Sequence, residues 1–264
     1  MPYSLIDIGA NLTHDSFDAD RTEVMQRAAD AGVARIIVTG SSNQGNIDAA
    51  AFAEANPGRV FATAGVHPHH ASDYTAASAE LIRSLAQKDV VVAVGECGLD
   101  YFRNYSPQHA QVEAFRSQLE IAADIGLPVF LHQRDAHDDF VKVLEPLLPG
   151  LTRAVAHCFT GEDQSLEKLL EMGLSIGITG WICDERRGAH LKDIVSVIPD
   201  DKLMLETDAP YLMPRTLSPR PKSRRNEPAF LPEVLRVVAE ARSQSIEHVA
   251  SISTENAMRF FGLD

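Results

Sequence analysis

Short apolar runs alternate with longer amphipathic stretches along this chain, at intervals of roughly 30 residues, a spacing typical of strand–helix units in a parallel sheet. The runs are nearly continuous in Val, Ile, Leu and Ala, as expected for strands buried on both faces. They predict eight strands, at residues 5–9, 35–40, 60–66, 90–95, 128–132, 154–157, 174–179 and 202–206.

The stretches between these runs carry helix signals. Ser106 and Pro107 predict an N-cap and a first helical residue, and Gly126 predicts the end of that helix. Asp135 is expected to cap the helix after the fifth strand, with His137 inside it. Two helices are predicted to end the chain, at about residues 231–242 and 246–261.

Eight strand–helix units predict a TIM (β/α)₈ barrel, which typically takes ~250 residues, close to the 264 present here. No shift in composition marks a linker, so we expect a single domain over residues 1–264. One irregular stretch, residues 209–228, is rich in Pro, Arg, Lys and Ser and follows the last strand. Loops of this length are usually functional or disordered, and we expect this one to border the active site.

Composition narrows the partners and the compartment. The formal net charge is −13, which argues against a protein that coats duplex nucleic acid but leaves room for a local basic pocket. No apolar run is long enough to span a membrane, and the N-terminus does not resemble a signal peptide. The 3 cysteines lack CxxC spacing, which favours a reducing compartment. We expect a cytoplasmic protein, monomeric and without membrane contact.

Candidate chemistry gathers where the predicted strands end, which in a closed parallel barrel is the catalytic edge. Imidazoles and carboxylates occur together there, and sets of this kind bind divalent cations that activate water. The members are His67, His69, His70, His132, His157, Glu96 and Asp208.

Seven segments resemble, in order, the signature blocks of the TatD family of nucleases. They run from residue 7 to residue 228 and read DIGANLT, GVHPH, GECGLD, HCFTG, IGITGW, ETDAPYL and SRRNEP. The resemblance implies a barrel fold and a metal-dependent deoxyribonuclease that degrades single strands from the 3′ end. It also implies a magnesium requirement, although histidine ligands alone would suit Mn²⁺ or Zn²⁺.

Carried over to this sequence, the resemblance assigns Glu96, His132 and His157 as metal ligands. Asp208 would be a further ligand or the base that acts on the bound water. His67 would contact the scissile phosphate or assist the leaving group.

The phosphates of the nucleic-acid substrate would be held by a second set of residues, namely Arg224, Arg225, Arg186, Asn11 and His69. Related barrel hydrolases carry a His-x-His pair on the first strand, where this chain has Gly9 and Asn11. We therefore expect one well-held metal and at most a weaker second one.

Several alternatives stay open at this point. Trp181 and Tyr211 could stack on a splayed base or serve only in packing. The charge run of Arg186 and that of Arg224 could be solvated faces. The same barrel and ligands could also serve an amide, ester or aminoacyl-ester hydrolase, or a non-catalytic relative that only binds nucleic acid. The substrate strand could be DNA or RNA.

Overall fold

The computed structural model describes residues 4–263. All eight expected strands are present and follow one another in chain order through one sheet. The pairs β3–β4, β4–β5, β5–β6 and β7–β8 are parallel. The strands are β1 Leu5–Ala10, β2 Val33–Val38, β3 Val60–Ala64, β4 Val91–Asp100, β5 Val129–Arg134, β6 Ala154–Ala156, β7 Ser175–Ile178 and β8 Leu203–Leu205.

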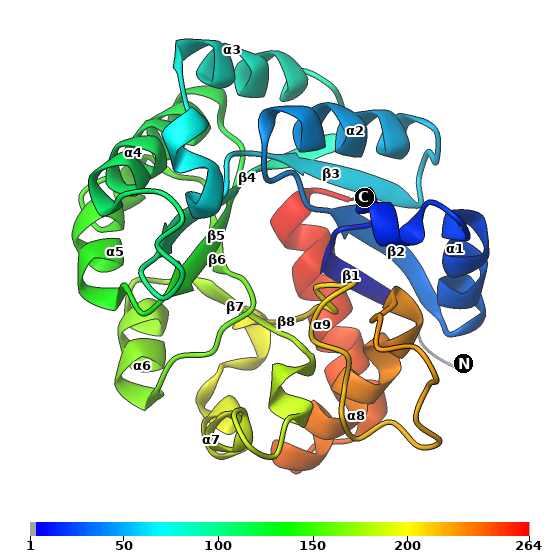
Figure 1. Ribbon diagram of the computed structural model, residues 1–264. Helices are drawn as coiled ribbons and strands as arrows, with labels where there is room; N and C mark the ends of the chain where they lie inside the picture. Colours follow the sequence, from blue (N-terminus) through cyan, green and yellow to red (C-terminus); the bar gives the residue numbers. More distant parts are fainter. Residues whose placement is uncertain (1–3, 264) are drawn as a thin grey trace. The chain divides into compact units, whose positions relative to one another are not determined.

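Helices separate the strands, as the apolar periodicity predicted (Figure 1). Parallel strands in chain order with intervening helices are the topology of the TIM (β/α)₈ barrel, which confirms the expected fold class. The α-helices are α1 Arg21–Asp30, α2 Asn43–Glu54, α3 Ala76–Leu85, α4 Gln108–Ile125, α5 His137–Leu144, α6 Asp163–Glu171, α7 Ala189–Ile194, α8 Leu231–Ala241 and α9 Ile246–Phe261.

The chain divides into two compact units. The central unit contains Val38–His157 and Glu171–Leu174. The terminal unit contains the chain up to Ile37, then Cys158–Leu170, and the chain from Ser175 onward. Whether the chain is one domain stays a prediction.

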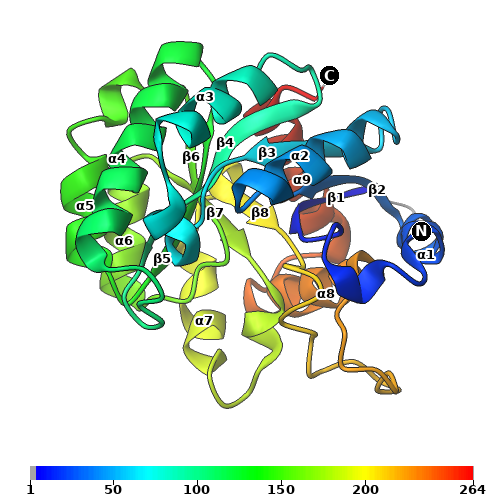
Figure 2. The same ribbon diagram turned by 45° about the horizontal axis from the view of Figure 1, so that its top comes forward.

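In the central unit, helices α2 to α5 follow one another around strands β3 to β5 (Figures 1 and 2). Helix α2 packs on β3, and α4 packs on β4 and against both α3 and α5. The buried rings of Phe115 and Phe140 stack with centroids 5.2 Å apart, joining α4 to α5. This apolar layer fixes the strands from which the candidate metal ligands project.

In the terminal unit, the first and last strands are neighbours. A parallel bridge pairs Ala10 with Ala209, and the amide of Asp208 donates to the carbonyl of Gly9 over 2.8 Å. Helix α9, red in Figure 1, packs on both β1 and β8, and α8 packs on α9. The neighbouring ends of β1 and β8 therefore bring Asn11 and Asp208 together.

Three details differ from the sequence-based expectation. Strand β4 continues to Asp100, so Glu96 lies inside a strand instead of after it. Helix α4 follows Pro107 without a side-chain cap, because the Ser106 hydroxyl donates to the carbonyl of His69 instead. Asp135 is not a cap, since α5 follows Ala136 and no side chain caps it.

Other local expectations are confirmed. Gly126 ends α4 in the left-handed conformation, with φ 75°. The final two helices lie where predicted, at α8 and α9. Residues 209–227 form no helix or strand apart from the bridge at Ala209, and this loop projects beyond α8 in Figure 2. No helix within residues 4–263 has the length and apolar character needed to cross a membrane.

Candidate metal centre and basic pocket

A bulge in strand β4 presents Glu96 to the candidate site. The register with β5 pairs Gly95 with Phe130 and then Cys97 with Leu131, so Glu96 is skipped by the ladder. Its amide donates instead to the carbonyl of Gly40 over 2.7 Å. Bulges of this kind redirect a side chain and are common beside active sites. The bulge therefore separates Glu96 from the regular alternation of the strand.

Glycine is required on either side of this bulge. Gly95 and Gly98 have φ of 138° and 145°, which side-chain-bearing residues rarely adopt. A Cβ at Gly98 would collide with the carbonyl oxygen of His132, and one at Gly95 with that of Phe130. The two glycines thus allow β4 to approach β5 closely enough for Glu96 to meet His132.

Three imidazoles converge on one oxygen of the Glu96 carboxylate. The distances to Glu96 Oε1 are 2.7 Å from His157 Nε2, 3.0 Å from His132 Nδ1 and 3.3 Å from His67 Nε2. Glu96, His67 and His157 are buried, and His132 is partly buried. The ligand atoms of His67, Glu96 and His132 all lie within 4.8 Å of one another. The structure therefore brings together the three predicted metal ligands and His67, all within the central unit.

His67 differs from His132 in the ring nitrogen that it presents to Glu96, which is Nε2 in His67 and Nδ1 in His132. It precedes a short 3₁₀ helix, Pro68–Asp73, and its Nδ1 accepts a hydrogen bond of 3.0 Å from the amide of His69. Because Nδ1 is an acceptor, the ring proton belongs on Nε2, which faces Glu96. His67 is therefore arranged as a proton donor and is less suited to ligate a metal through Nε2 than its distance alone suggests.

The His132 ring has the reverse orientation, with Nδ1 toward Glu96 and Nε2 toward Asp100. The buried Asp100 carboxylate places Oδ2 at 3.6 Å from His132 Nε2 and at 2.8 Å from His69 Nε2. A carboxylate at this position favours a proton on His132 Nε2 and leaves the lone pair of Nδ1 facing Glu96. Metal-binding histidines are commonly held in this way, with a carboxylate behind the ring.

Burial and the neighbouring charges together shift the pKa values of the Glu96 carboxyl and of two imidazoles, those of His67 and His132. Burial lowers the pKa of His67 to about 4, and the attraction of Glu96 only partly offsets it. Burial would raise the pKa of Glu96, but His67 and His157 bring it well below its ordinary value. Burial also acts against protonation of His132, yet the neighbouring carboxylates of Asp100 and Glu96 raise its pKa. The cluster thus holds a stable carboxylate anion in a buried position.

These features fit a bound cation. An unprotonated Nδ1 lying 3.0 Å from a carboxylate oxygen places lone pair against lone pair, which is unfavourable unless a positive charge lies between them. Imidazole nitrogen and carboxylate oxygen are ordinary donors to divalent metals. Glu96, His132 and His157 therefore form a suitable donor set.

Asp208 and Asn11 lie in the terminal unit, where they contact each other. Asn11 Nδ2 donates to Asp208 Oδ1 over 3.3 Å. Asp208 has φ of 56°, and the preceding residue, Thr207, is held by Asp7 through its amide at 2.9 Å and through its hydroxyl. Burial raises the pKa of Asp7 to about 7. Asp7 thus acts as a buried support for the segment that carries Asp208.

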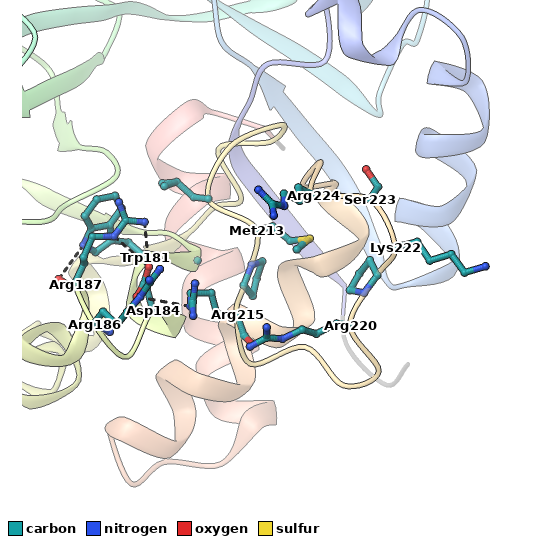
Figure 3. A pocket seen from close by; sticks show the side chains of 14 residues that line it. Trp181, Asp184, Arg186, Arg187, Met213, Arg215, Arg220, Lys222, Ser223 and Arg224 are labelled. Atoms are coloured by element: carbon teal, nitrogen blue, oxygen red, sulfur yellow. Dashed lines mark hydrogen bonds and ion pairs between the residues drawn. The ribbon is translucent and has the colours of Figure 1, made fainter.

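A basic pocket of about 670 Å³ lies elsewhere in the terminal unit, between the segment after β7 and residues 212–224 (Figure 3). Six cationic side chains line it against one carboxylate, that of Asp184, in a chain whose net charge is −13. The cations are Arg186, Arg187, Arg215, Arg220, Lys222 and Arg224. This local reversal of charge is suited to an anionic ligand.

The pocket arginines differ in how firmly they are held. The Arg187 guanidinium lies 4.6 Å from the Trp181 ring centroid and 3.0 Å from Asp184 Oδ2. Arg215 bonds Glu185 over 2.9 Å. In contrast, the exposed side chains of Arg224 and Lys222 have no hydrogen bond or ion pair with any described residue. These two cations are therefore the most available to a ligand.

Arg225 does not line this pocket. Its guanidinium lies 2.7 Å from Asp20 Oδ2 and 2.8 Å from Glu227 Oε1, and 4.7 Å from the Phe17 ring centroid. Asp20 and Glu227 raise the pKa of Arg225 further. A phosphate would have to compete with two carboxylates for this side chain, so its geometry favours anchoring the loop to α1.

The remaining candidate residues differ in their exposure and contacts. His69 contacts Asp100 and His67, whereas His70 is exposed. Trp181 is partly buried and donates from Nε1 to the Arg187 carbonyl over 3.2 Å. Sequence reasoning assigned no role to Asp100, although its place at the end of GECGLD was visible. It also missed Arg215 and Arg220, because neither belongs to a recognisable motif.

A parallel barrel topology with a buried carboxylate shared by imidazoles from successive strands defines a barrel hydrolase with a candidate metal centre. Comparison with known families is consistent with this class. Residues 6–262 match the model of the family described as TatD related DNase, and the chain belongs to this family.

Curated relatives and solved structures agree. The chain is 52% identical to the 3′-5′ ssDNA/RNA exonuclease TatD of Pantoea vagans, over 98% of this chain and 100% of the relative. It is 51% identical to the protein of the same name from Erwinia billingiae, over 98% and 99%. A TatD homologue from Escherichia coli superposes with a TM-score of 0.89 at 30% identity, covering 98% of both chains. A TatD family hydrolase from Entamoeba histolytica gives 0.90 at 26% identity, covering 100% of both.

Proposed function

We propose that this protein is a metal-dependent exonuclease that removes nucleotides from the 3′ end of single-stranded DNA or RNA. The observation that carries the proposal is the convergence of His67, His132 and His157 on one buried oxygen of Glu96. The names of relatives about 50% identical over nearly the whole chain support the same activity.

Glu96, His132 and His157 would hold the cation, for which we propose Mg²⁺, with Mn²⁺ or Zn²⁺ as alternatives. When bound, such a cation polarises a phosphate oxygen and lowers the pKa of a bound water. Asp100 would keep His132 in the tautomer that presents Nδ1. Asp208 is proposed as a further ligand or as the base that takes the proton of the attacking water.

His67 is proposed to act on the leaving group. Its Nε2 carries the proton because Nδ1 accepts from the amide of His69. Its pKa of about 4 keeps the ring neutral at pH 7. A neutral imidazole can still donate a hydrogen bond to an oxygen on which charge develops, and this stabilises the transition state.

We propose that positively charged side chains bind the phosphates of the nucleic-acid strand. Arg224 and Arg186 are proposed to bind phosphates at the basic pocket, and Asn11 and His69 are proposed to contact phosphate near their own clusters. Arginine suits this task because its guanidinium offers paired donors to phosphate oxygens. Arg225, grouped with these residues by its position in the sequence, would contribute mainly by holding the loop that carries Arg224.

We also propose that the protein acts in DNA repair or DNA degradation. It would do so in the cytoplasm and as a monomer. The activity is tested by a time course on oligonucleotides labelled at either the 5′ or the 3′ end. We expect shortening from the 3′ end, loss of activity with chelator and recovery on addition of Mg²⁺. A panel of esters, amides and aminoacyl esters serves as the control, since turnover of these without nuclease activity would overturn the assignment.

A further inference from the structure

The loop after strand β4 carries two of the five large hydrophobic side chains that are exposed within the described residues. Phe102 is 54% exposed and Tyr105 67% exposed, although only seven residues, 101–107, separate β4 from α4. Single exposed hydrophobic residues are ordinary on protein surfaces. Two on one short loop beside the candidate metal centre form a place where a ligand could make apolar contact.

This loop is held rigidly by hydrogen bonds. The amide of Arg103 donates to Asp100 Oδ1 over 2.8 Å, and Gln111 Nε2 donates to the Ser106 carbonyl over 2.8 Å. The Tyr101 hydroxyl donates to Asp139 Oδ2 over 3.0 Å. The exposed rings therefore project from a fixed backbone, which lowers the entropy lost when a ligand binds them.

Tyr105 is connected to the metal centre through ring contacts. Its ring meets His69 edge-on, with centroids 4.7 Å apart, and the His69 ring lies 4.2 Å from that of His67. His67 in turn reaches Glu96. A group resting on Tyr105 would thus be only two side chains away from the Glu96 carboxylate.

The two aromatic rings are not equivalent. Arg134 places its guanidinium carbon 4.0 Å from the Phe102 ring centroid, and that of Arg103 lies at 5.6 Å. Tyr105 has only the edge contact with His69, and its hydroxyl has no hydrogen bond with the residues that the structure describes. Tyr105 therefore offers an open ring face, while Phe102 supports two cations beside it.

We infer that Tyr105 is a stacking platform for the nucleobase next to the scissile phosphate. This inference rests on the proposed exonuclease function and names a substrate contact for it. Aromatic faces accept any base, so the platform would position the strand end without reading its sequence. Arg103 and Arg134 supply the positive charge that a neighbouring backbone phosphate requires. An apolar protein partner would have no need of these cations.

The test compares Tyr105→Ala, Tyr105→Phe and Tyr105→Trp on two oligonucleotides, one with a normal 3′ nucleotide and one with an abasic 3′ residue. On the normal end we expect Tyr105→Ala to raise KM by roughly 5- to 150-fold, since stacking contributes about 1–3 kcal/mol per base. The Phe and Trp variants should stay close to wild type. On the abasic end, Tyr105→Ala should match wild type.

Ile47→Ala, which truncates an exposed apolar side chain on α2 of the same unit, is the matched control. An equal loss with Tyr105→Ala on both oligonucleotides, no loss on either, or a loss with Tyr105→Phe would overturn the inference. Binding of the labelled strand in the presence of chelator separates the two proposals. Binding that depends on Tyr105 but is never followed by cleavage would support the platform and overturn the exonuclease. A wild-type protein that neither binds nor cuts would overturn both.

Discussion

The candidate metal centre and the basic pocket are built in opposite ways. In the central unit, Glu96 and its imidazoles are largely removed from solvent, and each imidazole has a nitrogen within 3.3 Å of Glu96 Oε1. In the terminal unit, the basic pocket is open and several of its cations are exposed. Burial strengthens electrostatic interactions and fixes geometry, whereas exposed charges act at longer range and are screened by salt. The first design suits chemistry and the second suits capture of a flexible anion.

This contrast is tested most strongly at Glu96. Glu96→Gln keeps the shape of the side chain but removes the anion to which three imidazoles point. We expect turnover of single-stranded DNA to fall by at least about 100-fold, because a preorganised charge in a buried site is lost. Bound metal, measured on the purified variant, should fall with it.

Strand affinity should change little in Glu96→Gln, since the basic pocket is untouched. Circular dichroism provides the control for folding. A variant that digests DNA at the wild-type rate would show that the cluster is structural and that the chemistry lies elsewhere.

Asp100 should have the next largest effect. Asp100→Asn removes the charge that orients His132 and His69 while leaving every proposed ligand in place. Loss of such a supporting carboxylate typically reduces metal affinity by about 10- to 100-fold. Metal titration of activity measures the shift, and excess metal should restore most of kcat.

Asp124→Asn is the matched control for Asp100→Asn, because Asp124 is an exposed acid of the same unit that pairs with Arg83 at 2.7 Å. Unchanged metal dependence in both variants would mean that Asp100 has no part in positioning the ligands.

A variant of Arg225 tests how the loop that carries Arg224 is anchored to α1. Arg225→Ala should lower the free energy of unfolding by about 1–2 kcal/mol, a discounted figure because the pairs are partly exposed. Arg225 and Arg27 lower the pKa of Asp20 to about 2, from an ordinary value of 3.8. Stability from a depressed carboxyl pKa is present above the unfolded value and is lost as the pH falls.

The difference between wild type and Arg225→Ala, followed by denaturant unfolding, should therefore narrow between about pH 4 and pH 2. Metal affinity at Glu96 should not change. A constant difference across this range would show that the Asp20 pair contributes little.

Arg224 should give the smallest effect and the clearest dependence on salt. Arg224→Ala removes an exposed cation that has no partner among residues 4–263, so the fold should keep its stability. Strand affinity should fall several-fold, and the slope of log K against log salt should shrink by about 0.7, the value for one phosphate contact on a single strand.

Arg236→Ala, an exposed arginine of α8 that pairs with Glu233, serves as the control for Arg224→Ala. An equal change in both variants would indicate a general effect of net charge, and the pocket would lose its proposed role.

The sequence alone determined the architecture. Apolar runs recurring between amphipathic stretches specified eight strands and their helices, because burial on both faces of a parallel strand demands such composition. The rule that chemistry lies at strand ends then selected a wider set of histidines and carboxylates, and the family resemblance narrowed it to Glu96, His132 and His157. These three residues do meet in the structure. The end of α4 at Gly126 could also be predicted, since the left-handed conformation at a helix end favours glycine.

Only the tertiary structure decided how the selected residues are used. The bulge at Glu96 depends on register with β5, which local sequence does not encode. The tautomer of His67 depends on the amide of His69, and the orientation of His132 depends on Asp100. Adjacent arginines 224 and 225 look alike in sequence, yet one is open and the other is paired with Asp20, 205 residues away along the chain. Pairing across such a separation is fixed by packing of the folded chain, and no local pattern records it.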